Sequence, residues 1–254
     1  MPNHLFDALV APHADNPACF VRRAGLPDMS FAAFAALTGR LAHVLAGLGV
    51  GVGDRVTVQA PKCIEMVALY VATIRVGGVF LPLNTAYTVD EVAYFVGDAQ
   101  PKVLICDGAR DAALRPLAAA HGATRLTLNA DGSGSLTDGL DGHPDAFPNA
   151  DRGPDDLAAL LYTSGTTGRS KGAMLSHGNL VSNTEVLRDH WRITDADTLI
   201  HALPIFHTHG LFVATNTVLL AGGCMRFLPG FDLDAMLEAM PSSTLLMGVP
   251  TFYT

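Results

Sequence analysis

The sequence predicts an α/β fold in which parallel-rich sheets are layered with helices. First, short β-rich runs alternate with helical spans of roughly ten to sixteen residues, as they do in parallel βαβ units. Second, the chain has 254 residues, of which 49% are hydrophobic and only 16% charged, so it can bury a sizeable core and is not extensively disordered. Third, the second half of the chain repeats the alternation of the first.

Local signals place the elements of the first half. Ser30 precedes an apolar helical stretch that ends in a glycine-rich turn, and Pro61 opens a second helix with its apolar residues on one face. Thr88 and Glu91 form a capping box, which starts a third helix. A fourth helix is expected over 109–121, and the intervening strands over 55–59, 79–83 and 102–106.

The second half follows a polar segment. Residues 129–156 are rich in Gly, Asp, Pro and Ser, and we interpret them as a solvated connection between two α/β halves rather than as a functional lid. Beyond it we expect strands over 158–162, 173–176, 198–204, 224–228 and 244–249, with helices over 179–191, 209–220 and 233–240.

The charge balance and the cysteines exclude several classes of protein. The formal net charge is −8, from 16 basic and 24 acidic residues, and no Lys/Arg run offers a nucleic-acid footprint. The four cysteines are scattered without a CxxC motif, so they are expected to be buried thiols in a reducing compartment. With no secretory signal pattern and no uninterrupted membrane-length apolar run, we expect a soluble cytoplasmic protein.

The stretch YTSGTTGRSKG, from Tyr162 to Gly172, carries the chemistry. Glycines let the backbone approach a ligand closely, hydroxyls and bare N–H groups cradle phosphate oxygens, and Lys171 adds a mobile positive charge. The order Gly168-Arg-Ser-Lys171-Gly fails the Walker A template, and the loop runs into a strand instead of a helix. The sequence therefore predicts a phosphate-binding loop of another kind.

This loop resembles the signature of the adenylate-forming superfamily, which includes acyl- and aryl-CoA synthetases, although Ser170 stands where the family usually has Pro. The runs AMLSHGNL after the loop, LPIFHTHGL further on and VGGVFLPLNTAYT upstream are also similar to acyl-CoA synthetases. The combination of LPLNTAYT, PIFHTHGLFV and GVPTFYT is most similar to malonyl-CoA synthetases. The resemblance covers nearly the whole chain and implies the amino-terminal part of the family's large domain.

The resemblance implies a two-step reaction: a carboxylate attacks the α-phosphorus of ATP to give an acyl-adenylate and pyrophosphate, and coenzyme A then displaces AMP. Mg²⁺ would bridge phosphate oxygens, with Thr163 as a weaker candidate ligand, and His207 would lie beside the carboxylate and the α-phosphate. The β- and γ-phosphates would be held by Thr163, Ser164, Gly165, Thr166, Thr167, Gly168 and Lys171.

The histidines also allow other interpretations. From spacing alone, His207 beside Phe206 is as readily a core residue as a site residue, and the family resemblance favours the site. His207 and His209 would suit two metal ligands, but no third Cys, His or acidic residue lies at a sensible spacing.

The family's adenine-binding and hinge motifs and its adenylation lysine lie downstream of Thr254. We therefore expect residues 1–254 to be an amino-terminal portion, inactive alone, of an ATP-dependent acid–thiol ligase that forms malonyl-CoA from malonate. Within the class, an oxalate or monocarboxylate CoA ligase is the alternative, and a peptide-synthetase adenylation domain is disfavoured by the HTHGL motif. A short non-catalytic nucleotide-binding module would apply if the protein ends at Thr254.

Overall fold

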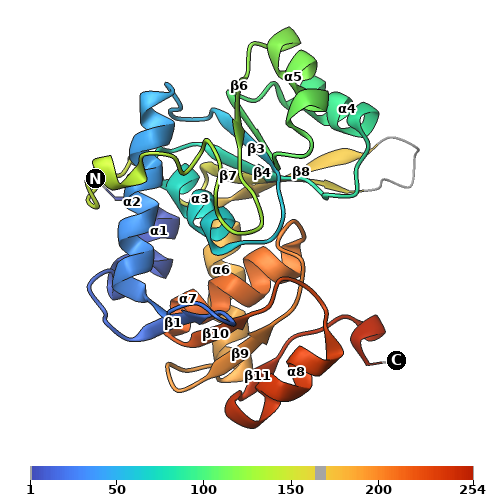
Figure 1. The fold of residues 1–254 in the computed structure, drawn as a ribbon. Coiled ribbons are helices and arrows are strands. Elements are labelled where there is room, and N and C mark those ends of the chain that lie inside the picture. Colours follow the sequence, from blue (N-terminus) through green and yellow to red (C-terminus); the bar gives the residue numbers. More distant parts are fainter. Residues whose placement is uncertain (1, 164–169, 254) are drawn as a thin grey trace. The chain divides into compact units, whose positions relative to one another are not determined.

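The computed structural model describes residues 2–163 and 170–253 and has the α/β architecture expected from the sequence (Figure 1). The chain divides into two compact units, each with its own mixed, mostly parallel sheet. The first unit comprises Met1–Phe6 and Ala36–Gly178, and the second comprises Asp7–Ala35 and Asn179–Thr254. The second unit is thus built from two segments that lie far apart in the sequence.

The sheet of the first unit has the strand order β6-β5-β3-β4-β7-β8, in which every neighbouring pair is parallel except the antiparallel pair β7–β8. The strands are β3 (Arg55–Gln59), β4 (Val79–Pro82), β5 (Val103–Cys106), β6 (Thr124–Thr127), β7 (Leu157–Thr163) and β8 (Lys171–Ser176). The helices in this part of the chain are α1 (His4–Leu9), α2 (Phe31–Gly47), α3 (Ile64–Arg75), α4 (Val89–Ala99), α5 (Asp111–Ala120) and the short η2 (Leu140–Gly142).

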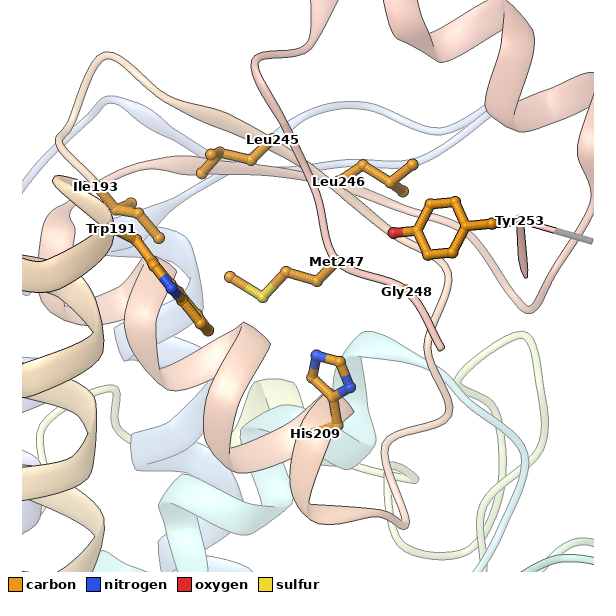
Figure 2. Close-up of a pocket in the computed structure, with 8 residues that line it drawn as sticks. All are labelled: Trp191, Ile193, His209, Leu245, Leu246, Met247, Gly248 and Tyr253. Atoms are coloured by element: carbon orange, nitrogen blue, oxygen red, sulfur yellow. The ribbon is translucent and has the colours of Figure 1, made fainter. Parts of the chain in front are cut away.

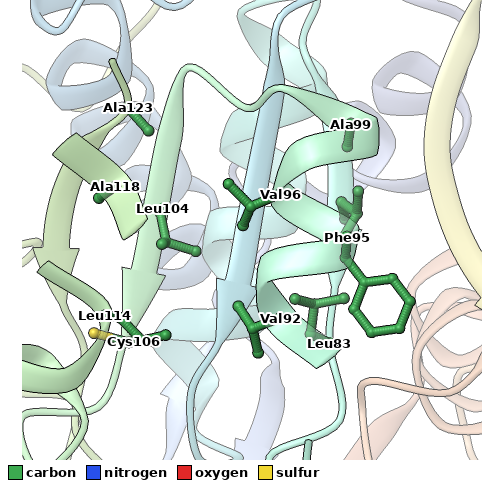
Figure 3. Close-up of a cluster of buried hydrophobic side chains, with 11 residues drawn as sticks. Leu83, Val92, Phe95, Val96, Ala99, Leu104, Cys106, Leu114, Ala118 and Ala123 are labelled. Atoms are coloured by element: carbon green, nitrogen blue, oxygen red, sulfur yellow. The ribbon is translucent and has the colours of Figure 1, made fainter. Parts of the chain in front are cut away.

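Helix α4 is fixed both at its start and along its length. The expected capping box is confirmed: the Thr88 hydroxyl accepts from the Glu91 N–H, and the Glu91 carboxylate accepts from the Thr88 N–H at 2.8 Å. Val92 and Val96, one turn apart, face Leu104 of β5 (Figure 3). The other buried members of this cluster are Leu81, Leu83, Phe95, Ala99, Cys106, Leu114, Ala118 and Ala123.

Helix α3 begins later than Pro61, where the sequence pattern had placed its start. The N-cap residue Cys63 is extended, with φ −144° and ψ 165°, so helical geometry begins at Ile64. The helix is buried almost all round, and its expected apolar face is included in that burial. A helix buried on every side shows a weak periodicity, which explains why its start was hard to place.

Residues 129–156 lie wholly within the first unit and are held by specific bonds. Arg40 of α2 forms an ion pair with Asp145 at 2.7 Å. The Nε atom of the buried Arg75 donates to the Asn149 side chain at 2.8 Å. These bonds tie the polar segment to α2 and α3.

The sheet of the second unit has the strand order β11-β9-β10-β1-β2, parallel except for the pair β1–β2. The strands are β1 (Cys19–Arg22), β2 (Met29–Ser30), β9 (Thr198–His201), β10 (Cys224–Phe227) and β11 (Leu245–Leu246). The helices are α6 (His177–Trp191), α7 (Asn216–Ala221), α8 (Leu233–Ala239), the π-helix η3 (His209–Thr215) and the short turns η1 (Ala11–His13), η4 (Met240–Ser242) and η5 (Pro250–Phe252).

Two neighbours in this sheet come from opposite ends of the chain. Strand β1 pairs with β10, and the Sγ atoms of Cys19 and Cys224 lie 3.4 Å apart. Cys63, Cys106 and Cys224 are buried as expected, whereas Cys19, the first residue of β1, is only half-buried. In the part of the chain that the structure describes, no helix is both long and apolar enough to cross a membrane.

His177, at the start of α6, is completely buried, and its Nδ1 atom accepts a hydrogen bond from the Leu5 N–H at 3.3 Å. Burial lowers the pKa of His177 from 6.5 to about 4, because desolvation penalises the imidazolium. The folded pKa lies below the unfolded value, so acid protonates the unfolded chain first. This stability is therefore complete above pH 6.5 and is lost as the pH falls toward 4.

We expect the free energy of unfolding to fall by about 2–3 kcal/mol between pH 7 and pH 4 through this one group. Urea unfolding of the wild type and of His177→Gln, followed across that range, measures the contribution as the difference between the two pH profiles. His121→Gln removes an exposed histidine of the first unit, to which His177 also belongs, and should keep the wild-type profile. A His177→Gln profile as steep as that of the wild type would contradict the assignment.

Candidate functional site

The hairpin β7–β8 carries the two described ends of the predicted phosphate loop. Thr163, the last residue of β7, is directly paired with Lys171, the first residue of β8, and both are exposed. The expected strand on each side of the loop is confirmed. The other predicted loop residues, Ser164, Gly165, Thr166, Thr167 and Gly168, lie outside the described residues.

The pairing of Thr163 with Lys171 has a chemical consequence. A hydroxyl and an ammonium group are presented at one end of the hairpin, on adjacent strands. The hydroxyl can donate to a phosphate oxygen, and the ammonium group supplies a compact point charge with three donors. The described ends of the loop thus offer groups suited to a polyanion.

Side chains of α4 reach this hairpin, which the sequence patterns did not indicate. The Tyr94 hydroxyl donates to the backbone carbonyl of Ser170 at 2.9 Å. The Tyr162 hydroxyl donates to the Asp98 carboxylate at 2.5 Å. Tyr94 and Asp98 are one helical turn apart, a spacing that places them on one face, but only the fold shows that this face meets the hairpin.

His207 belongs to the second unit and lies in the loop between β9 and the π-helix η3. Its imidazole packs against the ring of Phe206, with 4.6 Å between ring centroids, and its side chain is exposed. Partial burial lowers the pKa of His207 below its ordinary value of 6.5. With its pKa below 6.5, the imidazole is mostly neutral at pH 7, a form that can donate or accept a hydrogen bond.

The backbone around His207 is shaped by Gly210. A Cβ atom at this position would overlap the carbonyl oxygen of Pro204, so only glycine lets the loop fold back this closely. The Gly210 carbonyl in turn accepts from the Thr215 hydroxyl at 2.9 Å and lies 2.9 Å from Nε2 of the buried His201. Because a carbonyl only accepts, Nε2 of His201 carries the proton.

These contacts accompany a correction to the helix expected over 209–220. Its first part, His209–Thr215, is a π-helix, and only Asn216–Ala221 is α-helical. π-Helical turns are frequent at functional sites. Sequence periodicity does not distinguish the two helix types over so short a span.

A cavity of about 330 Å³ opens beside His209, within the second unit (Figure 2). The side chains of His209, Trp191 and Met247 point toward the same space. The remaining lining residues are Ile193, Leu245, Leu246, Gly248 and Tyr253. The lining is therefore mainly apolar, with one imidazole. That imidazole belongs to His209, which follows His207 by two residues.

A protein-ligated metal centre has no support in residues 2–163 and 170–253. No group of three or more His, Cys, Asp or Glu side chains in these ranges is placed to hold a metal ion. His207 and His209 therefore lack a third protein ligand within this part of the chain. The exposed hydroxyl of Thr163 is a hard oxygen donor of the kind that Mg²⁺ accepts.

Solved structures match this fold along its entire length. MatB from Rhodopseudomonas palustris, solved in apo and ATP-bound forms, is 54% identical with a TM-score of 0.96, over 100% of this chain and 50% of its own. A putative long-chain-fatty-acid CoA ligase from Rhodopseudomonas palustris is 27% identical with a TM-score of 0.83, over 98% of this chain and 63% of its own.

Curated relatives agree with the structural matches. A feruloyl-CoA synthase from an Amycolatopsis species is 35% identical over 97% of this chain, and a malonate–CoA ligase from Arabidopsis thaliana is 32% identical over 82%. The matched regions span 48% and 36% of those relatives, so this chain covers half of their length or less. The sequence profile of the AMP-binding enzyme family matches residues 6–254. The chain belongs to the family of AMP-binding enzymes.

Proposed function

We propose that the polypeptide carrying this chain is an ATP-dependent acid–thiol ligase, which activates a small carboxylate as its adenylate and transfers the acyl group to coenzyme A. The observation that carries the proposal is the 54% identity to MatB, a protein solved with ATP bound, across the whole of this chain. The curated CoA ligases among the relatives support the same reaction class. ATP and coenzyme A are both supplied in the cytoplasm, which fits the expected location.

In the first step, an oxygen of the carboxylate attacks the α-phosphorus of ATP, and the bond to pyrophosphate breaks. In the second, the thiolate of coenzyme A attacks the acyl carbon and AMP leaves. Both steps move negative charge onto a leaving group, so catalysis consists mainly of positioning and charge neutralisation.

Lys171, Thr163 and the loop residues Ser164, Gly165, Thr166, Thr167 and Gly168 are assigned to the β- and γ-phosphates. The ammonium group of Lys171 would neutralise charge on the departing pyrophosphate. Mg²⁺ would be held chiefly by phosphate oxygens, with the Thr163 hydroxyl as a protein donor, and would supply further charge neutralisation.

His207 is assigned to the carboxylate and the α-phosphate. Because its imidazole is neutral at pH 7, its N–H can donate to an oxygen of the adenylate without fixing the substrate in an ion pair. The packing of Phe206 against the imidazole holds the orientation of the ring. The exposed position leaves the imidazole accessible to a substrate.

We propose malonate as the acid, on the similarity of PIFHTHGLFV and GVPTFYT to malonyl-CoA synthetases and on the malonate–CoA ligase among the relatives. The second carboxylate of malonate needs a cationic or strongly donating partner, since an unpaired buried charge is costly. Among the described residues that line the cavity, His209 carries an imidazole, whose N–H can donate a hydrogen bond to this second carboxylate.

The lining of the same cavity favours a second candidate, a ligase for an acid with a hydrocarbon or aromatic acyl group. The side chains of Trp191, Leu245 and Met247 offer such a group apolar surface. None of the three carries a positive charge that could pair with a second carboxylate. A feruloyl-CoA synthase is among the relatives at 35% identity. The two candidates differ in substrate but share the adenylation chemistry.

ATP–pyrophosphate exchange by the complete natural polypeptide tests the choice. With malonate, we expect exchange well above the background without acid, and less with oxalate, propionate or ferulate. We also expect His209→Ala to lower kcat/KM for malonate about tenfold, because it removes a hydrogen bond to a charged group.

His190→Ala is the matched control, since His190 is an exposed histidine near the end of α6 and does not line the cavity. Exchange driven by ferulate or propionate but not by malonate would replace the first substrate assignment with the second. Exchange with none of these acids would contradict the proposed function itself.

A further inference from the structure

Helix α4 contacts the phosphate-loop hairpin at two points, one at Tyr162 of β7 and one at Ser170, the residue before β8. On the β8 side, the Tyr94 hydroxyl donates to the carbonyl oxygen of Ser170 at 2.9 Å. On the β7 side, the Tyr162 hydroxyl donates to Oδ2 of Asp98 at 2.5 Å. Ser170 immediately precedes Lys171, so the first bond holds the backbone next to the residue whose side chain carries the ammonium group.

Aromatic packing reinforces both bonds. The ring of Phe95 lies between those of Tyr94 and Tyr162 in the contact network, with centroid distances of 5.4 Å and 4.5 Å. The Tyr162 ring also lies against Gly172, its cross-strand partner, where an added Cβ would be 3.6 Å from the ring. The hairpin and the helix are thus joined by hydrogen bonds and by apolar contact.

The two hydroxyls are in the protonation state that these bonds require. Burial, followed by the hydrogen bond to Asp98, raises the pKa of the Tyr162 hydroxyl well above its ordinary value of 10. Tyr162 therefore stays protonated and donates throughout the physiological range. The Tyr94 hydroxyl must donate as well, because its partner is a carbonyl oxygen.

Helix α4 is itself a rigid base for these contacts. Its first turn is closed by the Thr88–Glu91 capping box, and Val92 and Val96 are buried in the apolar cluster against which Tyr94 also packs (Figure 3). Such a helix holds Tyr94 and Asp98 in fixed positions. Groups supported by a packed element are positioned more accurately than groups on a loop alone.

We propose that Tyr94, Asp98 and Tyr162 are positioning residues for ATP: they fix the hairpin on α4 and thereby aim Lys171 at the phosphates. The inference rests on the proposed function, since it assigns Lys171 to ATP. None of the three side chains is assigned a contact with substrate. Their effect is exerted through the backbone at Ser170 and through the β7 strand.

The test combines ATP–pyrophosphate exchange with calorimetric titration of ATP on the complete natural polypeptide. For Tyr94→Phe and for Tyr162→Phe, we expect KM and Kd for ATP to rise about three- to tenfold, the effect of losing one hydrogen bond. KM for the acid and the thermal midpoint should stay within error of the wild type. Asp98→Asn, which keeps a carbonyl acceptor for Tyr162, should recover most of the ATP affinity that Asp98→Ala loses.

Tyr87→Phe is the matched control. The Tyr87 ring packs against Phe95 at 5.0 Å, as the other two tyrosines do, and among the described residues its hydroxyl makes no hydrogen bond to β7 or β8. It should leave KM for ATP unchanged. A merely structural role would instead lower the thermal midpoint and change the KM values for ATP and the acid together, and that result would overturn the inference.

Failure of the inference and failure of the proposed function have different signatures. If the wild type exchanges pyrophosphate and binds ATP but Tyr94→Phe and Tyr162→Phe match it, the positioning role is wrong and the function stands. If the wild type binds ATP without exchange, the proposed reaction fails, and the Kd values still decide the positioning role. If ATP does not bind at all, both are overturned.

Discussion

Replacing Lys171 with alanine is expected to lower kcat/KM for ATP about 100-fold in pyrophosphate exchange, the size of effect seen when one charge-stabilising group is removed from an acyl- or phosphoryl-transfer site. The side chain is exposed at the first residue of β8, opposite Thr163, so its removal leaves no cavity in the core. The loss should therefore come without a change in the thermal midpoint.

Two further variants sharpen this result. Lys171→Arg keeps the positive charge in a different shape and should recover part of the activity. Lys102→Ala removes another exposed lysine of the same unit, distant in sequence from the loop, and should match the wild type. Wild-type kinetics for Lys171→Ala would remove this lysine from the phosphate site.

The second large effect concerns stability. Gly210→Ala is expected to lower the free energy of unfolding by about 3 kcal/mol, because the new methyl group overlaps the Pro204 carbonyl oxygen and the backbone must move. The movement would also disturb the bonds that His201 and Thr215 make to the Gly210 carbonyl. Urea unfolding followed by circular dichroism measures the change.

Gly230→Ala is the control for this prediction, since it lies in the same unit, has open space around its Cβ position and does not adopt a positive φ. It should shift stability by less than about 0.5 kcal/mol. Equal stabilities for the two alanine variants would show that the loop accommodates the methyl group. The close approach of Gly210 to Pro204 would then contribute nothing to the difference in the free energy of unfolding.

Elements defined by local signals were predictable from the sequence. The strand Arg55–Gln59 has the bounds expected from its alternation, and the capping box at Thr88 correctly placed the start of α4. Both features depend on residues within one turn or one strand. Their physical causes, side-chain capping and the alternation of faces, are visible in a short window.

Features that depend on distant segments were not predictable. The parallel pairing of β1 with β10 joins residues about 200 positions apart. The π-helical form of His209–Thr215 was also missed, because a span of seven residues has no periodicity that separates a π-helix from an α-helix. For the candidate site, Thr163 and Lys171 could be proposed from the sequence because the loop that they flank is contiguous, and the structure pairs them across the hairpin. The contacts of Tyr94 and Asp98 with the hairpin could not be predicted, because they exist only in the folded sheet.

The pairing of β1 with β10 also bears on how the chain is made. The ribosome completes β1 about 200 residues before β10, a delay of roughly 10 to 40 s at ordinary elongation rates. All strands of the first unit are synthesised within that interval, so this unit can fold co-translationally while residues 7–35 still lack their neighbour. During that time the nascent chain exposes an unpaired apolar strand edge, Cys19–Arg22, to chaperones and to aggregation.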